Sequence, residues 1–196
     1  MSSRFPPIPR SELTPEQQKG YDEIERLTQE TFGSSITLKD ENGAFIGPFT
    51  PLMYTPTLVN PWLTLAHQVI VHPALTERER ELAILPVLSY TKAAYALYAH
   101  SKLGLKAGLT EAQVADAKEG RLPCDISESE AAGFQFAKGI LEQLVQGGGG
   151  RVKDEVFEKA KGVLGTDKVA AVMHTVASFM YSGVMMNAGD VQAPEA

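Results

Sequence analysis

A carboxylate and an imidazole stand inside otherwise apolar sequence in the middle of the chain. Glu81 is followed by the run Leu-Ala-Ile-Leu, and His100 follows the run Tyr-Ala-Leu-Tyr-Ala. Such groups are costly to bury unless they are paired or used. A carboxylate and an imidazole can also exchange protons near neutral pH. The segment 75–109 therefore indicates where acid/base chemistry can take place.

Glu81 and His100 can meet only if the chain turns between them. They are 19 positions apart, which on one straight helix would separate them by ~28 Å. Pro86 and the break at 89–91 (Ser-Tyr-Thr) allow a turn. We therefore expect an antiparallel helix pair that brings the two side chains together.

The residues around His100 favour a hollow beside its ring. Ala93 and Ala96 lie on the same helical face as His100, and both are small. Tyr95 and Tyr98 flank this face and could supply phenol groups.

A plainer interpretation of the same residues stays open. Glu81 ends an alternating charge run that begins at Glu77, and such runs are usually solvated, here with Arg78 or Arg80 as partners. Helix histidines and tyrosines more often pack than react. His67 and His174 each lie in an apolar helix, where a histidine either bonds the backbone within the core or lines a pocket.

Length and composition fit one domain, residues 1–196, with an N-terminal arm at 1–13, a long loop at 33–56 and a tail at 188–196. The chain has 196 residues, 43% of them hydrophobic, which is enough for one proper core. The net charge of -6 comes without a basic run, so we expect no nucleic-acid partner.

Cys124 is the only cysteine, so no intrachain disulfide can form. The N-terminus has no apolar signal core, and we find no run of ~20 apolar residues that would span a membrane. We therefore expect a soluble, cytoplasmic protein without a membrane partner. The four histidines lack metal-ligand spacing, and we expect neither metal nor cofactor.

Helix start signals recur along the chain, and strand signals do not. Capping boxes begin at Thr14, Thr76, Thr110 and Ser127, and Asn60-Pro61 is a further N-cap candidate. We expect an all-α fold of about eight helices. The expected helices are about 15–31, 60–71, from 77 with a kink or early end at Pro86, 92–107, from 111, from 128 to a flexible glycine joint at 147–150, 152–164 and 167–187.

Three segments together resemble the carboxymuconolactone decarboxylase-like family, which shares the fold of alkylhydroperoxidase D. They are Arg80–Leu85, Tyr95–His100 and Ala107–Thr110, and further likeness near 47–49 and 180–188 extends the resemblance over about 45–190. It implies a helical bundle of the alkylhydroperoxidase D-like type whose hairpin builds the site. It also implies a homo-oligomer, a trimer or hexamer.

The resemblance assigns roles and also reveals a departure. Glu81 and His100 match the glutamate and histidine of the peroxidase branch, but its Cys-x-x-Cys pair falls on Ala93 and Ala96. Thiol peroxide reduction needs a thiolate and a resolving thiol, and Cys124 lies past the motif. The glutamate that many decarboxylase-like members carry four residues before the histidine is also replaced, by Ala96.

These observations favour a cofactor-independent acid/base enzyme, a decarboxylase, isomerase or related lyase, acting on a small lactone, carboxylic acid or polyketide-like metabolite. His100 would be the general base or acid, Glu81 would orient it or relay a proton, and Tyr95 and Tyr98 would bind or protonate an oxyanion. The expected pocket residues are His67, His174, Ala93 and Ala96. The alternative is a catalytically silent oligomer that binds a small ligand or acts as a scaffold. A peroxidase of the alkylhydroperoxidase D type is the third hypothesis.

Overall fold

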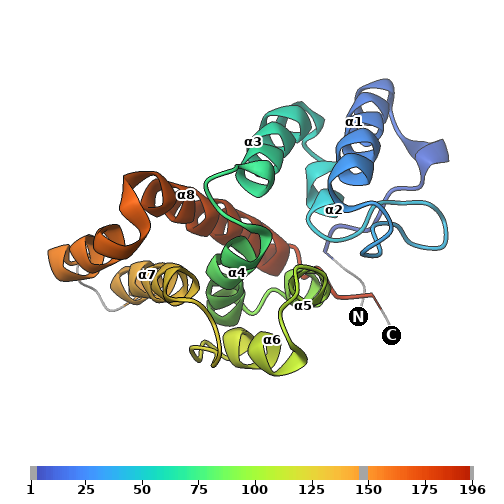
Figure 1. Cartoon of the computed structure of the whole chain (residues 1–196). Coiled ribbons are helices and arrows are strands. Elements are labelled where there is room, and N and C mark those ends of the chain that lie inside the picture. The colour runs from blue at the N-terminus through green and yellow to red at the C-terminus, as the bar shows by residue number, and fades with distance from the viewer. Residues whose placement is uncertain (1–3, 146–149, 195–196) are drawn as a thin grey trace.

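The computed structural model describes residues 4–145 and 150–194, and these residues form an all-α fold (Figure 1). The predicted fold class is confirmed: the described residues contain no strand, only one isolated bridge between Lys39 and Phe45. The helices are α1 (Pro15–Phe32), α2 (Phe49–Leu52), α3 (Val59–Val71), α4 (Glu77–Thr91), α5 (Ala94–Lys106), α6 (Glu111–Lys118), α7 (Glu128–Val145) and α8 (Asp154–Ala188), with short 3-10 turns at Arg10–Glu12 and Pro56–Leu58.

Helix α4 is the centre of the arrangement and packs against α5, α6, α7 and α8. The N-terminal helices α1 to α3 lie together at one end, and α3 contacts α8 (Figure 1). Two apolar clusters follow this division, one centred on α4, α5, α7 and α8 and the other on α1 to α3. The face of α5 that carries His100 lies where these two clusters meet.

The sequence of α4 explains its central place. All residues from Glu81 to Leu88 are buried, so the helix is covered on every side. Thr76 and Glu79 form the predicted capping box at its start. The expected early end at Pro86 is wrong, because the helix runs on to Thr91. The turn falls instead at Lys92, which adopts the left-handed conformation with φ 55°.

Other helix ends also differ from the expectations. The side chain of Asn60 does not cap α3, which begins at Val59; its Oδ1 accepts a hydrogen bond from Thr64 within the first turns. The loop 33–56 contains the short helix α2. The two predicted C-terminal helices join as α8 across a break at Gly165, whose φ is 74°. Of the glycine joint predicted at 147–150, residues 147–149 lie outside the described residues.

Helix α8 is long and apolar enough to cross a membrane by length and composition alone, with a mean hydropathy of 1.4 in its most apolar window. From the sequence we expect no stretch that is apolar enough to span a membrane, so α8 differs from that expectation. Half of that window is buried inside the protein, as in the core helix of a soluble domain, so this is weak evidence for a membrane span. The cytoplasmic location stays a prediction.

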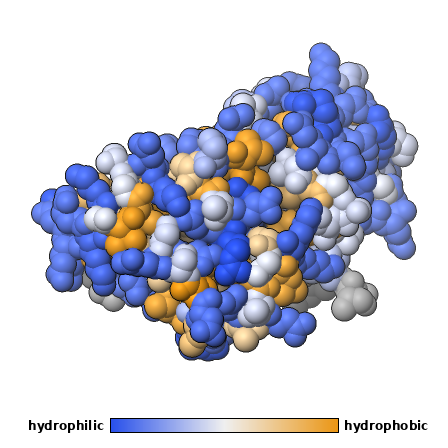
Figure 2. All heavy atoms as spheres, in the orientation of Figure 1, coloured by the Kyte–Doolittle hydropathy of each residue, from blue (hydrophilic) through white to orange (hydrophobic). Residues whose placement is uncertain are grey.

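Apolar side chains also reach the surface. Figure 2 shows hydrophobic patches among a largely hydrophilic face. On α8 the large exposed apolar side chains are Val163, Met173, Tyr181 and Val184. Such side chains are compatible with contacts between copies of the chain, and the predicted homo-oligomer stays a prediction.

Charged side chains fasten the first turn of α4 to its neighbours. Glu79, which is buried, accepts hydrogen bonds from Lys168 of α8 and Ser129 of α7. Arg78 donates to Glu130 of α7 with a distance of 2.6 Å. Burial raises the pKa of Glu79, but the hydrogen bonds from Lys168, Ser129 and Thr76 outweigh it and hold the pKa below the usual value of 4.5.

We predict that Glu79→Gln lowers the free energy of unfolding by about 1–3 kcal/mol at pH 7. Because the folded-state pKa of Glu79 lies below that of the unfolded chain, its contribution is present above about pH 4.5 and is lost as the pH falls through the lower folded value. Urea unfolding at pH 7 and at pH 3.5 measures both effects. Glu158→Gln, on an exposed part of α8, is the control and should change little. An equal loss of unfolding free energy for Glu79→Gln at both pH values would contradict the lowered pKa of Glu79.

Candidate active site

The structure joins Glu81 and His100 directly. Nδ1 of His100, on α5, lies 2.9 Å from Oε2 of Glu81, on α4, and the two side chains are only 9% and 7% exposed. The ring of Phe179, on α8, stands edge-on to the imidazole at 4.8 Å. The turn between α4 and α5 predicted from the spacing therefore brings these two groups into a buried hydrogen bond. Glu81 pairs with His100 and not with Arg78 or Arg80.

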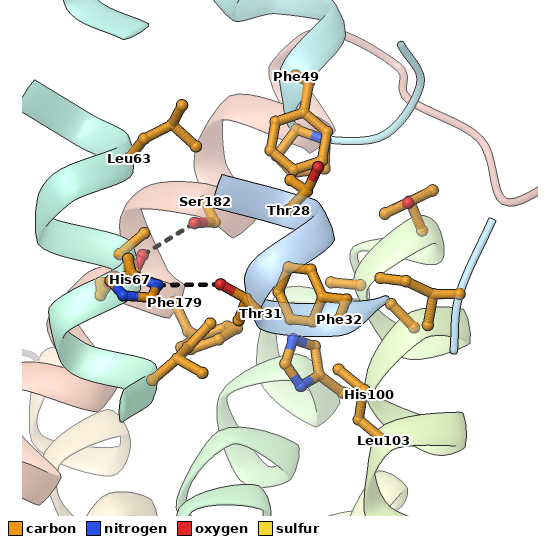
Figure 3. A pocket seen from close by; sticks show the side chains of 18 of the residues that line it. Thr28, Thr31, Phe32, Phe49, Leu63, His67, His100, Leu103, Phe179 and Ser182 are labelled. Atoms are coloured by element: carbon orange, nitrogen blue, oxygen red, sulfur yellow. Dashed lines mark hydrogen bonds between the residues drawn. The ribbon is translucent and has the colours of Figure 1, made fainter. Parts of the chain in front are cut away.

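A cavity of about 90 Å³ lies against His100 (Figure 3). Helices α1, α3, α5 and α8 and the segment around Phe49 supply its walls, which are mostly apolar, and we call it the apolar cavity. Its volume exceeds the ~10–15 Å³ that one water needs. Its lining includes Thr28, Thr31, Phe32, Phe49, Trp62, Leu63, His67, Tyr95, Ala96, His100, Leu103, Ser178, Phe179, Ser182 and Met186.

His67 lines the same apolar cavity, where it projects from α3 while His100 projects from α5 (Figure 3). Nδ1 of His67 lies 2.9 Å from Oγ1 of Thr31. The single hydroxyl hydrogen of Thr31 is donated to the carbonyl of Leu27 at 2.7 Å. Nδ1 of His67 is therefore the donor to Thr31, which leaves Nε2 without a partner among the described residues.

Most hydroxyl groups around the apolar cavity already donate a hydrogen bond to a main-chain carbonyl. Thr28 donates to the carbonyl of Ile24 at 2.6 Å, and Ser182 donates to the carbonyl of Ser178 at 3.0 Å. These bonds fasten side chains to their own helices. Within the described part of the lining, Ser178 and the two histidines keep side-chain atoms free for a ligand.

Tyr95 lines the apolar cavity, but its hydroxyl points to the loop that follows α1. It donates to the carbonyl of Thr37 at 2.6 Å. Burial, with a smaller contribution from Tyr98, raises the pKa of Tyr95 far above its usual range, so the phenol stays protonated. This hydrogen is already in use, which disfavours the expected oxyanion role for Tyr95.

Three of the predicted residues lie outside the apolar cavity. Tyr98 points away, bonding Thr37 and accepting from Lys102. Burial raises the pKa of Tyr98, but the bonds from Thr37 and Lys102 outweigh it and lower the pKa overall. Ala93 is fully buried at the start of α5 without reaching the cavity. His174 lies with His72 in a separate surface hollow because its face of α8 points outward.

A second cavity, of about 70 Å³, lies on another side of His100, and we call it the polar cavity. Charged residues line it: Glu77, Arg80, Glu81 and Lys106. Sequence reasoning did not single out Thr31, Ser178, Phe179 or Arg80. Arg80 carried a signal, since it adjoins Glu81, whereas the others come from helices whose packing the sequence does not reveal.

The family comparison agrees with this geometry. Residues 56–139, which contain both Glu81 and His100, match the model of the carboxymuconolactone decarboxylase family. This match supports the predicted resemblance to the carboxymuconolactone decarboxylase-like family over this part of the chain. A search of curated proteins found no match to this chain.

Solved structures share its fold. One is an alkylhydroperoxidase AhpD core, an uncharacterized peroxidase-related protein from Ralstonia eutropha JMP134, with TM-score 0.75 and 17% identity over 100% of this chain and 94% of that chain. Another is the debrominase Bmp8 without ligand, with TM-score 0.69 and 15% identity over 96% and 90% of the two chains. A third is Bmp8 with one cysteine changed to alanine, in complex with 2,3,4-tribromopyrrole, with TM-score 0.67 and 16% identity over the same shares.

We predict that Gly47→Ala destabilises the protein more than Gly43→Ala. Both glycines have a positive φ, 70° and 73°, so alanine is strained at either position, by about 1–2 kcal/mol. A Cβ at Gly47 would also lie 2.4 Å from the ring of Tyr95, whereas a Cβ at Gly43 meets nothing within 4 Å. We therefore expect an additional loss of about 1–3 kcal/mol for Gly47→Ala, measured by chemical unfolding. Equal losses for the two variants would show that the ring of Tyr95 is not held against Gly47.

Proposed function

We propose that the protein is a cofactor-independent acid/base enzyme that moves a proton on a small organic molecule. The observation that carries the proposal is the buried bond between Glu81 and His100 at the wall of the apolar cavity. A carboxylate that accepts from Nδ1 holds the imidazole in one tautomer and leaves Nε2 as the base. The Nε2 atom of His100 has no partner among the described residues.

The proposed reaction is an isomerisation or decarboxylation that passes through a stabilised carbanion or enolate. In an isomerisation, Nε2 of His100 takes a proton from a carbon acid, and the imidazolium formed is stabilised by the carboxylate of Glu81. The same proton is returned to a different carbon. In a decarboxylation, the carbon–carbon bond breaks with release of CO₂, and the protonated imidazole supplies the proton that replaces it.

His67 is the proposed second proton carrier. It lines the same cavity as His100, and its bond to Thr31 fixes its ring. Two imidazoles presented from different helices can serve different positions of one substrate. Tyr95 and Tyr98, whose hydroxyls bond the loop that follows α1, are not assigned a role in the chemistry.

The neighbours support binding of a small ring compound in this fold. The debrominase with a cysteine changed to alanine was solved with 2,3,4-tribromopyrrole bound. In this chain, Ala93 and Ala96 stand where the resemblance places the cysteine pair. We therefore propose that ligand binding survives here without thiols, while thiol peroxidase chemistry does not. The single cysteine, Cys124, is exposed in the loop between α6 and α7.

The second candidate function is a silent ligand-binding or scaffold protein. The loss of the thiols favours it, since a cavity that has lost its redox groups can still bind. An arginine paired with the buried Glu81 would have favoured it further, but the partner of Glu81 is an imidazole. The acid/base proposal accounts for this pair, and the silent-binder alternative does not.

The test is hydrogen exchange at carbon in D₂O, followed by proton NMR over a panel of small lactones, ring carboxylic acids and β-keto acids. We expect the protein to exchange at least one of them and His100→Ala to slow that exchange by about 10²–10⁴-fold. Glu81→Gln should slow it less, because the imidazole is kept but its tautomer is no longer held.

His174→Ala is the matched control, because His174 lies on α8 in a hollow separate from the apolar cavity. It should leave the exchange rate unchanged. Exchange that persists in His100→Ala, or that falls equally in His174→Ala, would overturn the assignment of His100. No exchange with any compound, together with retained ligand binding, would support the silent-binder alternative.

A further inference from the structure

Arg80 stands out among the arginines of the described residues because its side chain has no partner. Each of the others donates to a carboxylate or to a main-chain carbonyl. The Nε atom of Arg80 is buried and makes no hydrogen bond. A buried donor without a hydrogen bond costs free energy of folding. We therefore expect this atom to gain a hydrogen-bond acceptor when the protein binds its ligand.

Arg80 lines the polar cavity together with Glu81 and His100. Two other charged residues of this cavity, Glu77 and Lys106, are exposed to solvent and have opposite charges. The carboxylate of Glu81 is engaged by His100. Among the charged residues that line the polar cavity, Arg80 thus has both a buried donor and no ion pair to a carboxylate.

The polar and apolar cavities share a wall. Its members are Thr31, Phe32, Ile70, His100 and Leu103. All of them except His100 are only half-buried, so their side chains can shift without disturbing the core. A ligand that lies in the apolar cavity against His100 therefore has a short route to Arg80.

We propose that Arg80 and the polar cavity form an anion-binding subsite. It takes a carboxylate, or a similar planar anion, of a ligand whose ring occupies the apolar cavity. The guanidinium presents parallel N–H donors that match the two oxygens of a carboxylate, which a lysine ammonium cannot do. An anion held there fixes the ring beside His100. The proposal rests on the proposed function only in calling this ligand a substrate.

The protein contains a built-in reporter for the test. Trp62 is the only tryptophan of the sequence, and it lines the apolar cavity. A bromine atom on a ligand quenches tryptophan fluorescence at short range. The probes are 5-bromo-2-furoate and its neutral match 5-bromo-2-furamide, which differ in charge and hardly in shape.

We expect the furoate to quench Trp62 at lower concentration than the furamide. Arg80→Gln should weaken furoate binding by about 10- to 100-fold and leave furamide binding unchanged, and Arg80→Lys should restore part of the loss. Unchanged furamide binding also shows that the variant folds and keeps the apolar cavity. Lys102→Gln, on the outer face of α5 beside Tyr98, is the control for general surface charge and should change neither affinity.

Equal affinity for furoate and furamide, a failure of both to quench, or furoate binding that Arg80→Gln leaves intact would each overturn the proposal. Sedimentation of Arg80→Gln is measured in parallel, and a smaller assembly with unchanged furoate binding would assign Arg80 to an interface between copies instead. The carbon-acid exchange test separates this proposal from the proposed function. A loss of furoate binding in Arg80→Gln, together with no carbon acid found to exchange, would support this subsite and overturn the proposed function.

Discussion

The burial of helix α4 is the constraint on which the rest of the structure depends. This helix carries Glu81 at the head of a run that is buried through Leu88, with other helices on every side. A carboxylate in such a place must find a hydrogen-bonding partner. The turn at Lys92 makes this partner available, because the helix that follows the turn places His100 beside Glu81. Ion pairs at Glu79 and Arg78 fix the first turn of α4 against α7 and α8 and so hold Glu81 in register.

The surroundings of His100 then divide into two environments. On one side lies the apolar cavity, where most hydroxyl groups donate to carbonyls of their own helices, as Thr28 and Ser182 do. On the other side lies the polar cavity with Arg80. An imidazole between an apolar and a charged compartment is well placed to take a proton from a ring compound in one and to meet a charge in the other. Alanine at positions 93 and 96 leaves this arrangement without thiols.

The features that could be predicted from the sequence are those that depend on interactions between residues close along the chain. The capping boxes at Thr14, Thr76, Thr110 and Ser127 placed four helix starts correctly, because the hydrogen bonds involved lie within one turn. The Glu81–His100 pair could be expected from its spacing and from the resemblance. The sequence did not predict that Pro86 would lie inside an unbroken helix, since packing on all sides overrides the local preference. It also could not separate His67, which faces the apolar cavity, from His174, which faces outward, because both lie in apolar helices.

We propose that the bond to Glu81 holds the hydrogen of the His100 imidazole on Nδ1. Nitrogen-15 NMR of the protein labelled at histidine, at pH 8, reports the tautomer of each ring directly. We expect His100 to carry its hydrogen on Nδ1 and to have an unprotonated Nε2, and we expect Glu81→Gln to shift this tautomer while His174 stays unchanged. A hydrogen on Nε2 of His100 in the unaltered protein would contradict it, because the nitrogen proposed as the base would already be occupied.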